Sequence, residues 1–427
     1  MYHSVRVKLQ NLLLSLSDAL DLASPDLSQH QLRTSFVAWE IGKAAGLSTD
    51  DMTDLFIASL LHDVGALTTN EKLEVHLGKV EFPERHCFLG EKLLKQVSRF
   101  VNPSKIVRYH HTHYNDKNHD ELPPSIALSA QILLLADTLE RSIDRHKFIL
   151  HQEQSLIGYI KSLAGTYIRS DIVELFQSIA VREDFWFDLV SPRLYSTLLN
   201  NGPCRTIEVE LSQLLTISEM FRDMIDFRSR FTATHSSGVA AAASALSKAF
   251  GFTQTEIELM EVAGNLHDLG KMAVPNSILN KPDKLTNEEF AIMRQHTYYT
   301  YTILSTIGGI QYIAEWAAFH HERLDGSGYP FHIDGKNLSI NSRIMAVADI
   351  FTALTEQRPY RKSLLGQEQV LSILKSHCSR NWLDTSIVNL LERNYQGIDA
   401  YVRERQASTS EFYEREFQPE TFAEIME

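Results

Sequence analysis

The stretch Ala58-Ser-Leu-Leu-His-Asp-Val-Gly65 decides the fold, because a closely similar stretch occurs a second time. The second copy, Ala263-Gly-Asn-Leu-His-Asp-Leu-Gly270, begins 205 residues later. In each copy an apolar helical run ends at a His-Asp pair just before a glycine, a common place for a helix to stop and present polar groups. One His-Asp pair alone is weak evidence for a site. Its recurrence with the same surroundings indicates a duplicated unit.

Other residues match in the same order around this anchor. The matched pairs are His30 with His235, His86 with His296, His110-His111 with His320-His321, Leu135-Ala-Asp137 with Val347-Ala-Asp349, and Ile160-Lys-Ser162 with Leu374-Lys-Ser376. Their separation grows from 205 to 214 residues along the chain, as small loop insertions in the second copy would cause. The pattern is a duplication of roughly 200 residues, far longer than the period of a solenoid repeat.

The segments between the matched residues have the periodicity of helices. Residues 34–45, 53–62, 239–250 and 256–267 carry apolar side chains at three- and four-residue steps, and strand-like alternation is scarce. We therefore predict an all-α fold of two tandem helical bundles. Asn201-Gly-Pro-Cys-Arg205 contains the clearest helix breakers, which favours an N-terminal domain over 1–200, a connecting helix within 201–230 and a C-terminal domain over 231–427.

Composition narrows the classes of function. The 427 residues carry a formal charge of -13, which argues against a nucleic-acid polymer as partner and requires local cations or metals for a phosphate-bearing substrate. The three cysteines lie far apart, as expected in a reducing compartment. The sequence contains no run of about 18 apolar residues, the length that a membrane span needs. We therefore expect a cytoplasmic protein without a membrane partner. A homodimer is compatible with the sequence.

The second copy carries five imidazoles and two carboxylates that suit a metal centre. The set is His235, His267, Asp268, His296, His320, His321 and Asp349. A mixed nitrogen and oxygen set, with Asp268 able to bridge, favours two ions of iron or manganese. Two metals roughly 3.5–4 Å apart can activate a hydroxide and neutralise a phosphoryl oxygen. A lone histidine at a helix end is more often structural, but seven positions that recur in order favour a metal site.

Six further histidines have no counterpart in the other copy, and we expect them to be solvated or packed. They are His113, His119, His146, His151, His332 and His377.

The ordered pattern resembles the HD superfamily of metal-dependent phosphohydrolases, and the second copy resembles its HD-GYP branch. The resemblance rests on His320-His-Glu-Arg-Leu-Asp-Gly-Ser-Gly-Tyr-Pro330, His267-Asp-Leu-Gly-Lys271, Arg343-Ile-Met-Ala-Val-Ala-Asp349 and Arg358-Pro-Tyr-Arg361. It implies that the chain hydrolyses a cyclic dinucleotide, cyclic di-GMP or 3′,3′-cyclic GMP-AMP, to a linear dinucleotide. The tandem arrangement is similar to that of Vibrio phosphodiesterases that act on the hybrid nucleotide.

The resemblance also implies individual roles. Lys271 falls where the family keeps a lysine near the nucleophile and the scissile phosphate, so Lys271 and Asp268 are the implied catalytic residues. The implied substrate-binding residues are Gly328, Tyr329, Arg358 and Arg361. Arginine suits phosphate because its donors form a fork, although a surface pair that caps a helix would look the same in sequence. Phe231 stands where some members have a glutamate for a third metal, so two ions are expected.

The first copy keeps its ligand-type residues but differs around them. Its set, a candidate second metal site, is His30, His62, Asp63, His86, His110, His111 and Asp137. It resembles HD more than HD-GYP, because Ala66 occupies the lysine position and no Gly-Tyr-Pro follows His111. Asp26 precedes His30 by four residues, where a third carboxylate ligand could lie, although we expect a helix N-cap there. The first domain is then either a 5′-nucleotidase that acts on the linear product or a purely regulatory domain.

Two other functions compete with the phosphodiesterase. A cyclic-dinucleotide receptor would bind the ligand without turnover, but Lys271 and the full ligand set favour an enzyme. A nucleoside monophosphatase or deoxynucleotide triphosphohydrolase is the other alternative, against which Gly328-Tyr-Pro330 argues in the second copy. In the first copy that alternative stays open.

Overall fold

The computed structural model describes residues 5–79, 84–116, 122–229, 232–356 and 364–417. The chain divides into two compact units, Lys8–Glu208 and a second unit made of Met1–Val7 with Val209–Glu427. Each unit contains one copy of the repeat. The segment expected to connect the domains is divided between them, with residues up to 208 in the N-terminal unit and the following helix in the C-terminal unit.

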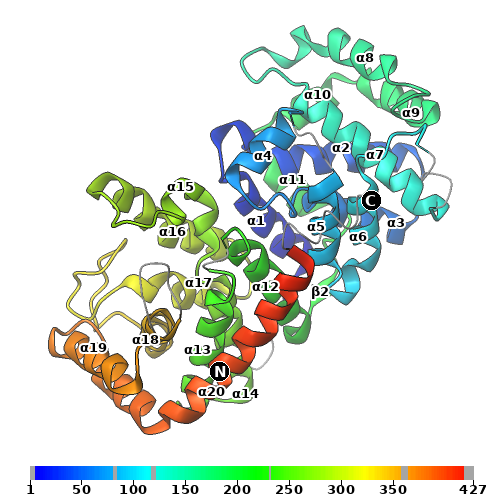
Figure 1. The fold of residues 1–427 in the computed structure, drawn as a ribbon. Coiled ribbons are helices and arrows are strands. Elements are labelled where there is room, and N and C mark those ends of the chain that lie inside the picture. Colours follow the sequence, from blue (N-terminus) through cyan, green and yellow to red (C-terminus); the bar gives the residue numbers. More distant parts are fainter. Residues whose placement is uncertain (1–4, 80–83, 117–121, 230–231, 357–363, 418–427) are drawn as a thin grey trace. The chain divides into compact units, whose positions relative to one another are not determined.

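The N-terminal unit is built from helices (Figure 1). They are α1 (Leu9–Asp21), η1 (Pro25–Leu27), α2 (His30–Ala44), α3 (Thr49–Leu60), α4 (Thr69–His76), α5 (Glu84–Leu94), η2 (Ser98–Phe100), α6 (Val101–Tyr109), α7 (Pro124–Arg141), η4 (Ile149–His151), α8 (Glu153–Ser162), α9 (Ser170–Ala180), α10 (Glu183–Leu189) and α11 (Leu194–Asn201). Helix α2 packs against both α3 and α7, so the core of this unit forms around α2.

The C-terminal unit is also helical. It contains α12 (Leu211–Asp226), α13 (His235–Phe250), α14 (Gln254–Leu266), η5 (Leu269–Ala273), α15 (Asn276–Leu279), α16 (Asn287–Ser305), α17 (Gln311–Ala318), η6 (Phe319–His321), α18 (Ile340–Thr355), α19 (Gln367–Ser379) and α20 (Thr385–Phe417). Helix α13 packs against α14, α18 and α20, which makes it the central helix. The predicted connecting helix is α12, which packs on α13 and α14 of this unit.

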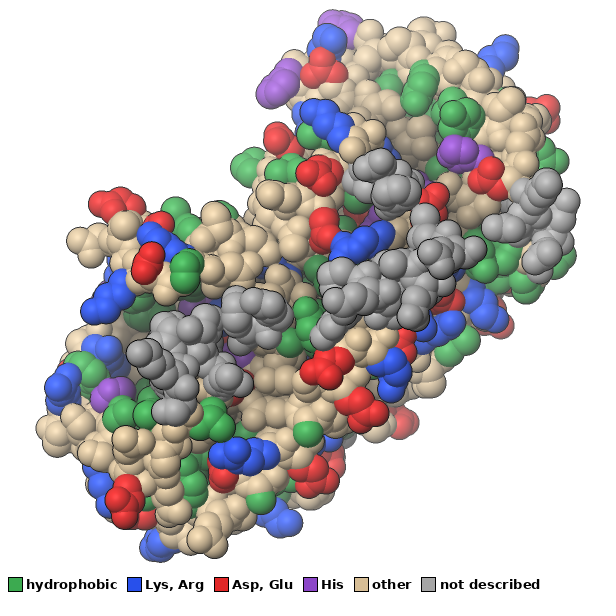
Figure 2. Space-filling view, in the orientation of Figure 1, with side chains coloured by type: hydrophobic (Ala, Val, Ile, Leu, Met, Phe, Trp, Pro, Cys, Tyr) green, Lys and Arg blue, Asp and Glu red, His purple; other side chains and the backbone are tan. Residues whose placement is uncertain are grey.

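The all-α prediction is confirmed. Within the described residues, the named strands are β1 (Val7–Lys8) and β2 (Glu208–Val209), which pair in a two-stranded sheet. Among the same residues, no helix combines the length and apolar character that a membrane span requires. Acidic and basic side chains are interspersed on the face drawn in Figure 2.

The helices that carry the first histidine of each copy begin earlier than their apolar periodicity predicts. Helix α2 begins at His30 and α13 at His235, because a buried carboxylate from the preceding helix binds the next backbone N–H. Asp21 accepts a hydrogen bond from the Gln31 N–H at 3.3 Å, and Asp226 accepts one from the Ser236 N–H at 2.7 Å. The two aspartates are another matched pair of the duplication.

The predicted N-cap role of Asp26 is wrong. Asp26 is exposed within η1, where its backbone N–H donates to the Ser24 side chain, and the residue before α2 is Gln29. The aspartate that stabilises the start of α2 is Asp21, which lies ten positions before Gln31 and therefore gives no local capping pattern in the sequence.

A glycine follows each His-Asp pair because the backbone of a neighbouring helix passes too close for a side chain. A Cβ on Gly65 would lie 2.1 Å from the carbonyl oxygen of His86, and one on Gly270 would lie 1.9 Å from that of His296. Thr300 bridges the same contact in the C-terminal unit: its hydroxyl accepts from the Gly270 N–H at 2.9 Å and donates to the His267 carbonyl at 3.0 Å. The glycine thus allows the His-Asp turn to lie directly against the helix that supplies the next histidine.

Replacement of Gly270 by alanine should therefore lower the free energy of unfolding of the C-terminal unit by about 1–3 kcal/mol through overpacking. The matched control is Gly397→Ala in α20, where a Cβ meets nothing within 4 Å. Alanine there should raise stability by about 0.5–1 kcal/mol, because glycine weakens a helix interior. Calorimetric unfolding of both variants checks this prediction, and equal stability of the two would contradict it.

Candidate functional site

The C-terminal unit brings together all seven residues predicted as its metal ligands. Asp268 is central: its two oxygens lie 3.2 Å from Nε2 of His267 and 3.5 Å from Nε2 of His296. Asp349 on α18 completes the cluster, with carboxylate oxygens 3.2 Å from Nε2 of His235 and 3.8 Å from Nδ1 of His321. The remaining ligand, His320, has its Nε2 3.4 Å from that of His296. Four helical elements, α13, α16, η6 and α18, and the His-Asp turn thus converge on one point.

Three of these imidazoles are oriented in the same way. Nδ1 of His267, His296 and His320 donates to the backbone carbonyl three residues earlier, at 2.8, 2.6 and 2.6 Å respectively. A donor at Nδ1 leaves the lone pair of the neutral ring on Nε2, which faces the cluster. Nε2 of His267 is buried and, among the described residues, no hydrogen bond to it is found, although Oδ2 of Asp268 lies 3.2 Å away. Metal-bound histidines are held in this manner by their other ring nitrogen.

His235 is oriented by a carboxylate instead of a carbonyl. Its Nδ1 lies 3.0 Å from Oε2 of Glu356, the C-cap residue of α18. The other oxygen of Glu356 accepts a hydrogen bond from Nε2 of Gln406 on α20 at 2.7 Å. Neither residue stands out in the sequence, since neither has a counterpart at a matched offset. Glu356 lies seven residues after Asp349, two helical turns along the same face, and that spacing could have suggested it.

Electrostatics hold the C-terminal donors in the form that binds metal. Burial lowers the pKa of His296 to about 3 and, together with His321, lowers the pKa of His320 well below its usual value. Burial alone would raise the pKa of Asp268, but His267 and Lys271 outweigh it and hold that pKa well below its usual range. Neutral imidazoles and ionised carboxylates are the ligand forms that a cation requires.

Lys271 lies beside the cluster, where the sequence placed it. Its ammonium donates to Oδ2 of Asp268, and the side chain is 21% exposed. The turn that carries it, η5, is held by the buried Arg228, whose guanidinium donates to the Lys271 carbonyl at 2.6 Å and to Asn276 at 2.6 Å. Arg228 is thus a supporting residue that the motif analysis missed.

The Gly-Tyr-Pro loop lies against the two adjacent histidines. The Tyr329 N–H donates to the His321 carbonyl at 3.3 Å, and the two rings are 4.9 Å apart. A Cβ on Gly328 would lie 2.4 Å from Cα of Glu322, so only glycine fits there. Glu322 stabilises the loop, because its carboxylate accepts hydrogen bonds from the Phe331 N–H at 2.7 Å and the Ile333 N–H at 3.1 Å. Arg358 and Arg361 lie outside the described residues.

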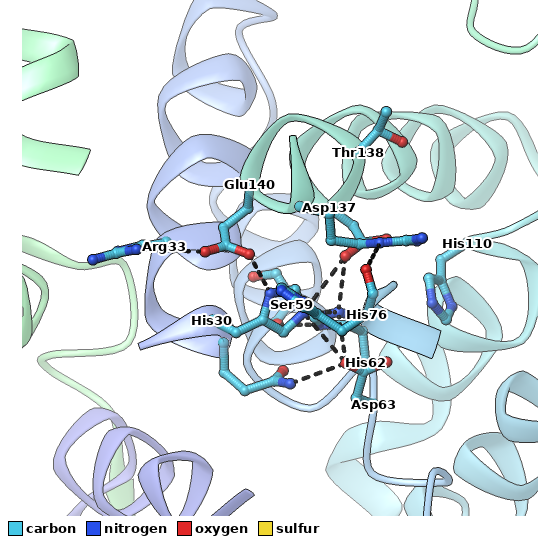
Figure 3. Close-up of polar contacts among 12 residues, drawn as sticks. His30, Arg33, Ser59, His62, Asp63, His76, His110, Asp137, Thr138 and Glu140 are labelled. Atoms are coloured by element: carbon cyan, nitrogen blue, oxygen red, sulfur yellow. Dashed lines mark hydrogen bonds and ion pairs between the residues drawn. The ribbon is translucent and has the colours of Figure 1, made fainter. Parts of the chain in front are cut away.

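The N-terminal unit assembles an equivalent cluster (Figure 3). Nε2 of His30 lies 3.2 Å from Nε2 of His62, 3.3 Å from Oδ2 of Asp63 and 3.5 Å from Oδ1 of Asp137. The other predicted ligands are close by: Nε2 of His86 is 3.4 Å from Nε2 of His110, and the rings of His110 and His111 are 4.2 Å apart. All seven predicted ligands of the first copy are therefore gathered.

The rings of the N-terminal cluster are anchored as in the second copy. Nδ1 of His62 donates to the Ser59 carbonyl at 2.9 Å, and Nδ1 of His110 donates to the Val107 carbonyl at 2.7 Å. Nδ1 of His30 is 2.5 Å from the buried Glu140, which comes three residues after Asp137 (Figure 3). The carboxylate partner of the first histidine therefore occupies a different turn of the helix in each copy.

A further histidine, His76, joins this cluster although it has no counterpart in the second copy. Its ring lies edge-on to that of His30, with centroids 5.0 Å apart (Figure 3). His30, His76 and Glu140 form one of the groups whose donor atoms are close enough to hold an ion.

Two imidazoles of the N-terminal cluster have raised pKa values. Burial would lower the pKa of His30, but Glu140 and Asp63 outweigh it and raise the pKa well above its usual value. The pKa of His62 is raised in the same way, because Asp63 and Asp137 outweigh burial. Burial lowers the pKa of His111 to about 3. A cation that binds here must displace protons from two imidazoles, so uptake at this cluster is expected to release protons.

Both clusters fit divalent metal ions. Each has buried imidazole nitrogens or carboxylate oxygens for which the described part of the chain supplies no hydrogen bond, including Nε2 of His267 in one, and Oδ1 of Asp63 and Nε2 of His111 in the other. Unpaired polar atoms are costly in a protein interior, and a metal ion would satisfy them. Groups of His and Asp donors in both units lie within 4.8 Å of one another.

Glu356→Ala should weaken metal binding in the C-terminal unit by roughly 10–100-fold, because the ring of His235 loses the partner that orients it. Chelator competition on the metal-loaded protein measures the change. Glu368→Ala, at an exposed position in α19, is the matched control and should leave affinity unchanged. Equal affinities of the two variants would show that Glu356 has no such role.

Comparison with protein-family models places an HD domain in each unit. One HD-domain model matches residues 27–142 and another matches residues 219–387. The chain is 27% identical over 400 residues to 3′3′-cGAMP-specific phosphodiesterase 1 of Vibrio cholerae, which covers 91% of this chain and 92% of the relative. It is 33% identical over 199 residues to a cyclic di-GMP phosphodiesterase of Thermotoga maritima, over 46% of this chain and 54% of the relative.

The fold has a solved counterpart. The crystal structure of a cyclic GMP-AMP-specific phosphodiesterase of V. cholerae, V-cGAP3, superposes with a TM-score of 0.62 over 93% of this chain and 98% of that chain, at 22% identity. The matched models, the similarity along nearly the whole chain and the shared fold agree on the same assignment. The chain therefore belongs to the HD superfamily of metal-dependent phosphohydrolases, with one HD domain in each of its two units.

Proposed function

We propose that this chain is a metal-dependent phosphodiesterase that opens a cyclic dinucleotide at its C-terminal cluster. The observation that carries the proposal is the ammonium of Lys271 beside Asp268, within a complete set of seven donors and next to the Gly328-Tyr329 loop. The substrates named for the relatives, 3′3′-cGAMP and cyclic di-GMP, support this substrate class.

Ring opening follows from these groups. Two metal ions at the cluster, for which iron and manganese fit the donors best, would supply a water of lowered pKa and neutralise a phosphoryl oxygen. Lys271 places a cation where charge develops on phosphorus, and Tyr329 presents a ring beside His321 on the substrate loop. Water adds to phosphorus, the P–O3′ bond breaks and the departing oxygen takes a proton. The product is a linear dinucleotide with a 5′-phosphate.

The variants His267→Ala and Asp268→Ala should abolish ring opening, since each removes a buried ligand of the cluster. Chromatography of the products from 3′,3′-cyclic GMP-AMP, cyclic di-GMP and cyclic di-AMP measures the activity and the purine preference together. His377→Ala is the control, because His377 lies on α19 against Trp382 and outside the cluster. Ring opening by a folded His267→Ala variant would refute the assignment. Tight binding without turnover by the metal-loaded wild type would favour a receptor.

Arg358 and Arg361 are proposed to bind the substrate phosphates, on the strength of the motif alone. Alanine at either position should raise the KM by roughly tenfold, as expected for the loss of a charge-assisted hydrogen bond, while metal content and melting temperature stay unchanged. Arg403→Ala on α20, whose side chain pairs with Asp399, is the control. A fall in melting temperature without a change in KM would assign the pair to the fold.

For the N-terminal cluster we propose a 5′-nucleotidase activity on the linear product. Its seven donors are assembled like those of the C-terminal cluster, but Ala66 is buried in place of the lysine. A terminal monoester is smaller at the reacting end than a cyclic diester. Water would add to phosphorus, the P–O5′ bond would break, and the 5′ oxygen would leave with a proton as inorganic phosphate forms. A regulatory domain that holds metal without turnover is the alternative.

The double variant His62→Ala with Asp63→Ala should stop phosphate release from the linear dinucleotide and leave ring opening intact, because the two clusters belong to separate units. The His267→Ala variant should still release phosphate from the same substrate. His151→Ala, at an exposed position in η4, is the control. A metal-loaded wild-type protein that releases no phosphate would leave the regulatory interpretation standing.

A further inference from the structure

A cavity of about 530 Å³ lies beside the N-terminal cluster. His111 of the cluster is part of its lining, together with residues from the ends of α4, α7 and α8. Its volume falls within the range of roughly 300–1,000 Å³ that is usual for small-ligand sites. The cavity therefore has room for a small molecule next to the proposed metal ligands.

The lining has the charge that suits an anion. It includes one arginine, Arg141, and three histidines, His76, His111 and His113, and none of the described residues that line it is Asp or Glu. The chain as a whole carries a formal charge of -13, so a lining without carboxylates departs from the general character of the protein. A negative group can enter this cavity without meeting a like charge from its lining.

Two hydrogen bonds orient Arg141 and involve only part of its guanidinium. Its Nη1 donates to Oδ2 of Asp137 at 3.1 Å, and its Nε donates to the His76 carbonyl at 2.9 Å. A guanidinium has five N–H groups, and within the described ranges of the chain no other hydrogen bond from this one is found. The side chain is 21% exposed. The remaining donors can bind a phosphate without breaking the two contacts that orient the fork.

The two copies place their cation on different elements. In the C-terminal copy, Lys271 bonds Asp268, and the residue four positions after Asp349 is Ala353. In the N-terminal copy the lysine position is Ala66, and the residue four positions after Asp137 is Arg141, which bonds that aspartate. The N-terminal site therefore keeps a cation bonded to a cluster carboxylate, but supplies it from α7 instead of the His-Asp turn.

Aromatic and apolar side chains line the rest of the cavity. Tyr159 and Tyr167 are part of the lining and are about half exposed, at 47% and 48%. The ring of Tyr167 lies 4.2 Å from that of His113, so this side of the cavity presents two adjacent rings. Exposed aromatic faces stack on nucleobases with little dependence on base identity. Leu134 and Leu163 add apolar surface.

We infer that this cavity binds the 5′-phosphorylated end of a nucleotide, with Arg141 on the phosphate and Tyr159 and Tyr167 against the attached nucleoside. This inference rests on the proposed nucleotidase role of the N-terminal cluster, for which it names the phosphate-binding residue. It assigns to Arg141 the place that Lys271 has in the other copy, with a forked donor in place of a point charge.

The test is equilibrium binding to the full-length, metal-free protein, with adenosine 5′-monophosphate and adenosine as probes in calorimetric titrations. Arg141→Gln should weaken binding of the monophosphate by roughly tenfold or more and leave adenosine binding within about twofold. Tyr159→Ala, with the guanidinium intact, should weaken both probes. The control is Arg182→Ala, since Arg182 pairs with Asp184 and is not part of the lining. Unchanged monophosphate binding in a folded Arg141→Gln variant would overturn the inference.

Turnover separates this inference from the proposed activity. If the metal-loaded wild type releases no phosphate from the linear dinucleotide but binds the monophosphate through Arg141, the nucleotidase proposal fails and the pocket assignment stands. If phosphate is released and Arg141→Gln changes neither the KM nor monophosphate binding, the activity stands and the pocket assignment is wrong.

Discussion

The structure of each unit depends on one constraint: a group of imidazoles and carboxylates must be buried together while their nitrogen and oxygen donor atoms stay directed at a common centre. Nearly all of these side chains are inaccessible to solvent. Burial of so many polar groups is costly unless each is paired. In both units the chain directs Nδ1 of the first histidine to a carboxylate and Nδ1 of the His-Asp histidine to a backbone carbonyl, so that the Nε2 atoms of these rings face inward. A bound cation would then satisfy the buried donor atoms that the described residues leave without a hydrogen bond.

The same constraint accounts for the surrounding helices. At a helix end, the carbonyl three residues earlier is not fully engaged by the helix, so a histidine there can donate to it. His267 and His320 stand at such ends, and the glycine after each His-Asp pair lets the next helix approach. Asp21 and Asp226 then hold the starts of the central helices. Burial raises the pKa of Asp21 to about 8, which indicates how dry this position is.

The duplicated units keep the inner donors and vary the groups behind them. The carboxylate that orients the first histidine is Glu140 in one copy and Glu356 in the other, three and seven residues after the matched aspartate. The cation changes from a lysine after the His-Asp pair to an arginine on α7. These changes keep the predicted metal ligands while altering what lies next to them. Divergence of this kind fits two sites that act on different phosphate esters.

The all-α fold, the two units and the clustering of seven matched residues in each could be predicted from sequence, because matched offsets and helical periodicity are visible in one chain. The supporting residues could not. Glu140, Glu356, His76 and Arg141 have no counterpart at a matched offset, so repetition gives no sign of them. Periodicity located the interiors of α2 and α13 but not their starts, which distant carboxylates determine. Anomalous diffraction from crystals of the metal-loaded protein tests the central claim most directly. The account predicts metal peaks inside both clusters, at Asp268 and at Asp63, and metal bound only elsewhere in the chain would contradict it.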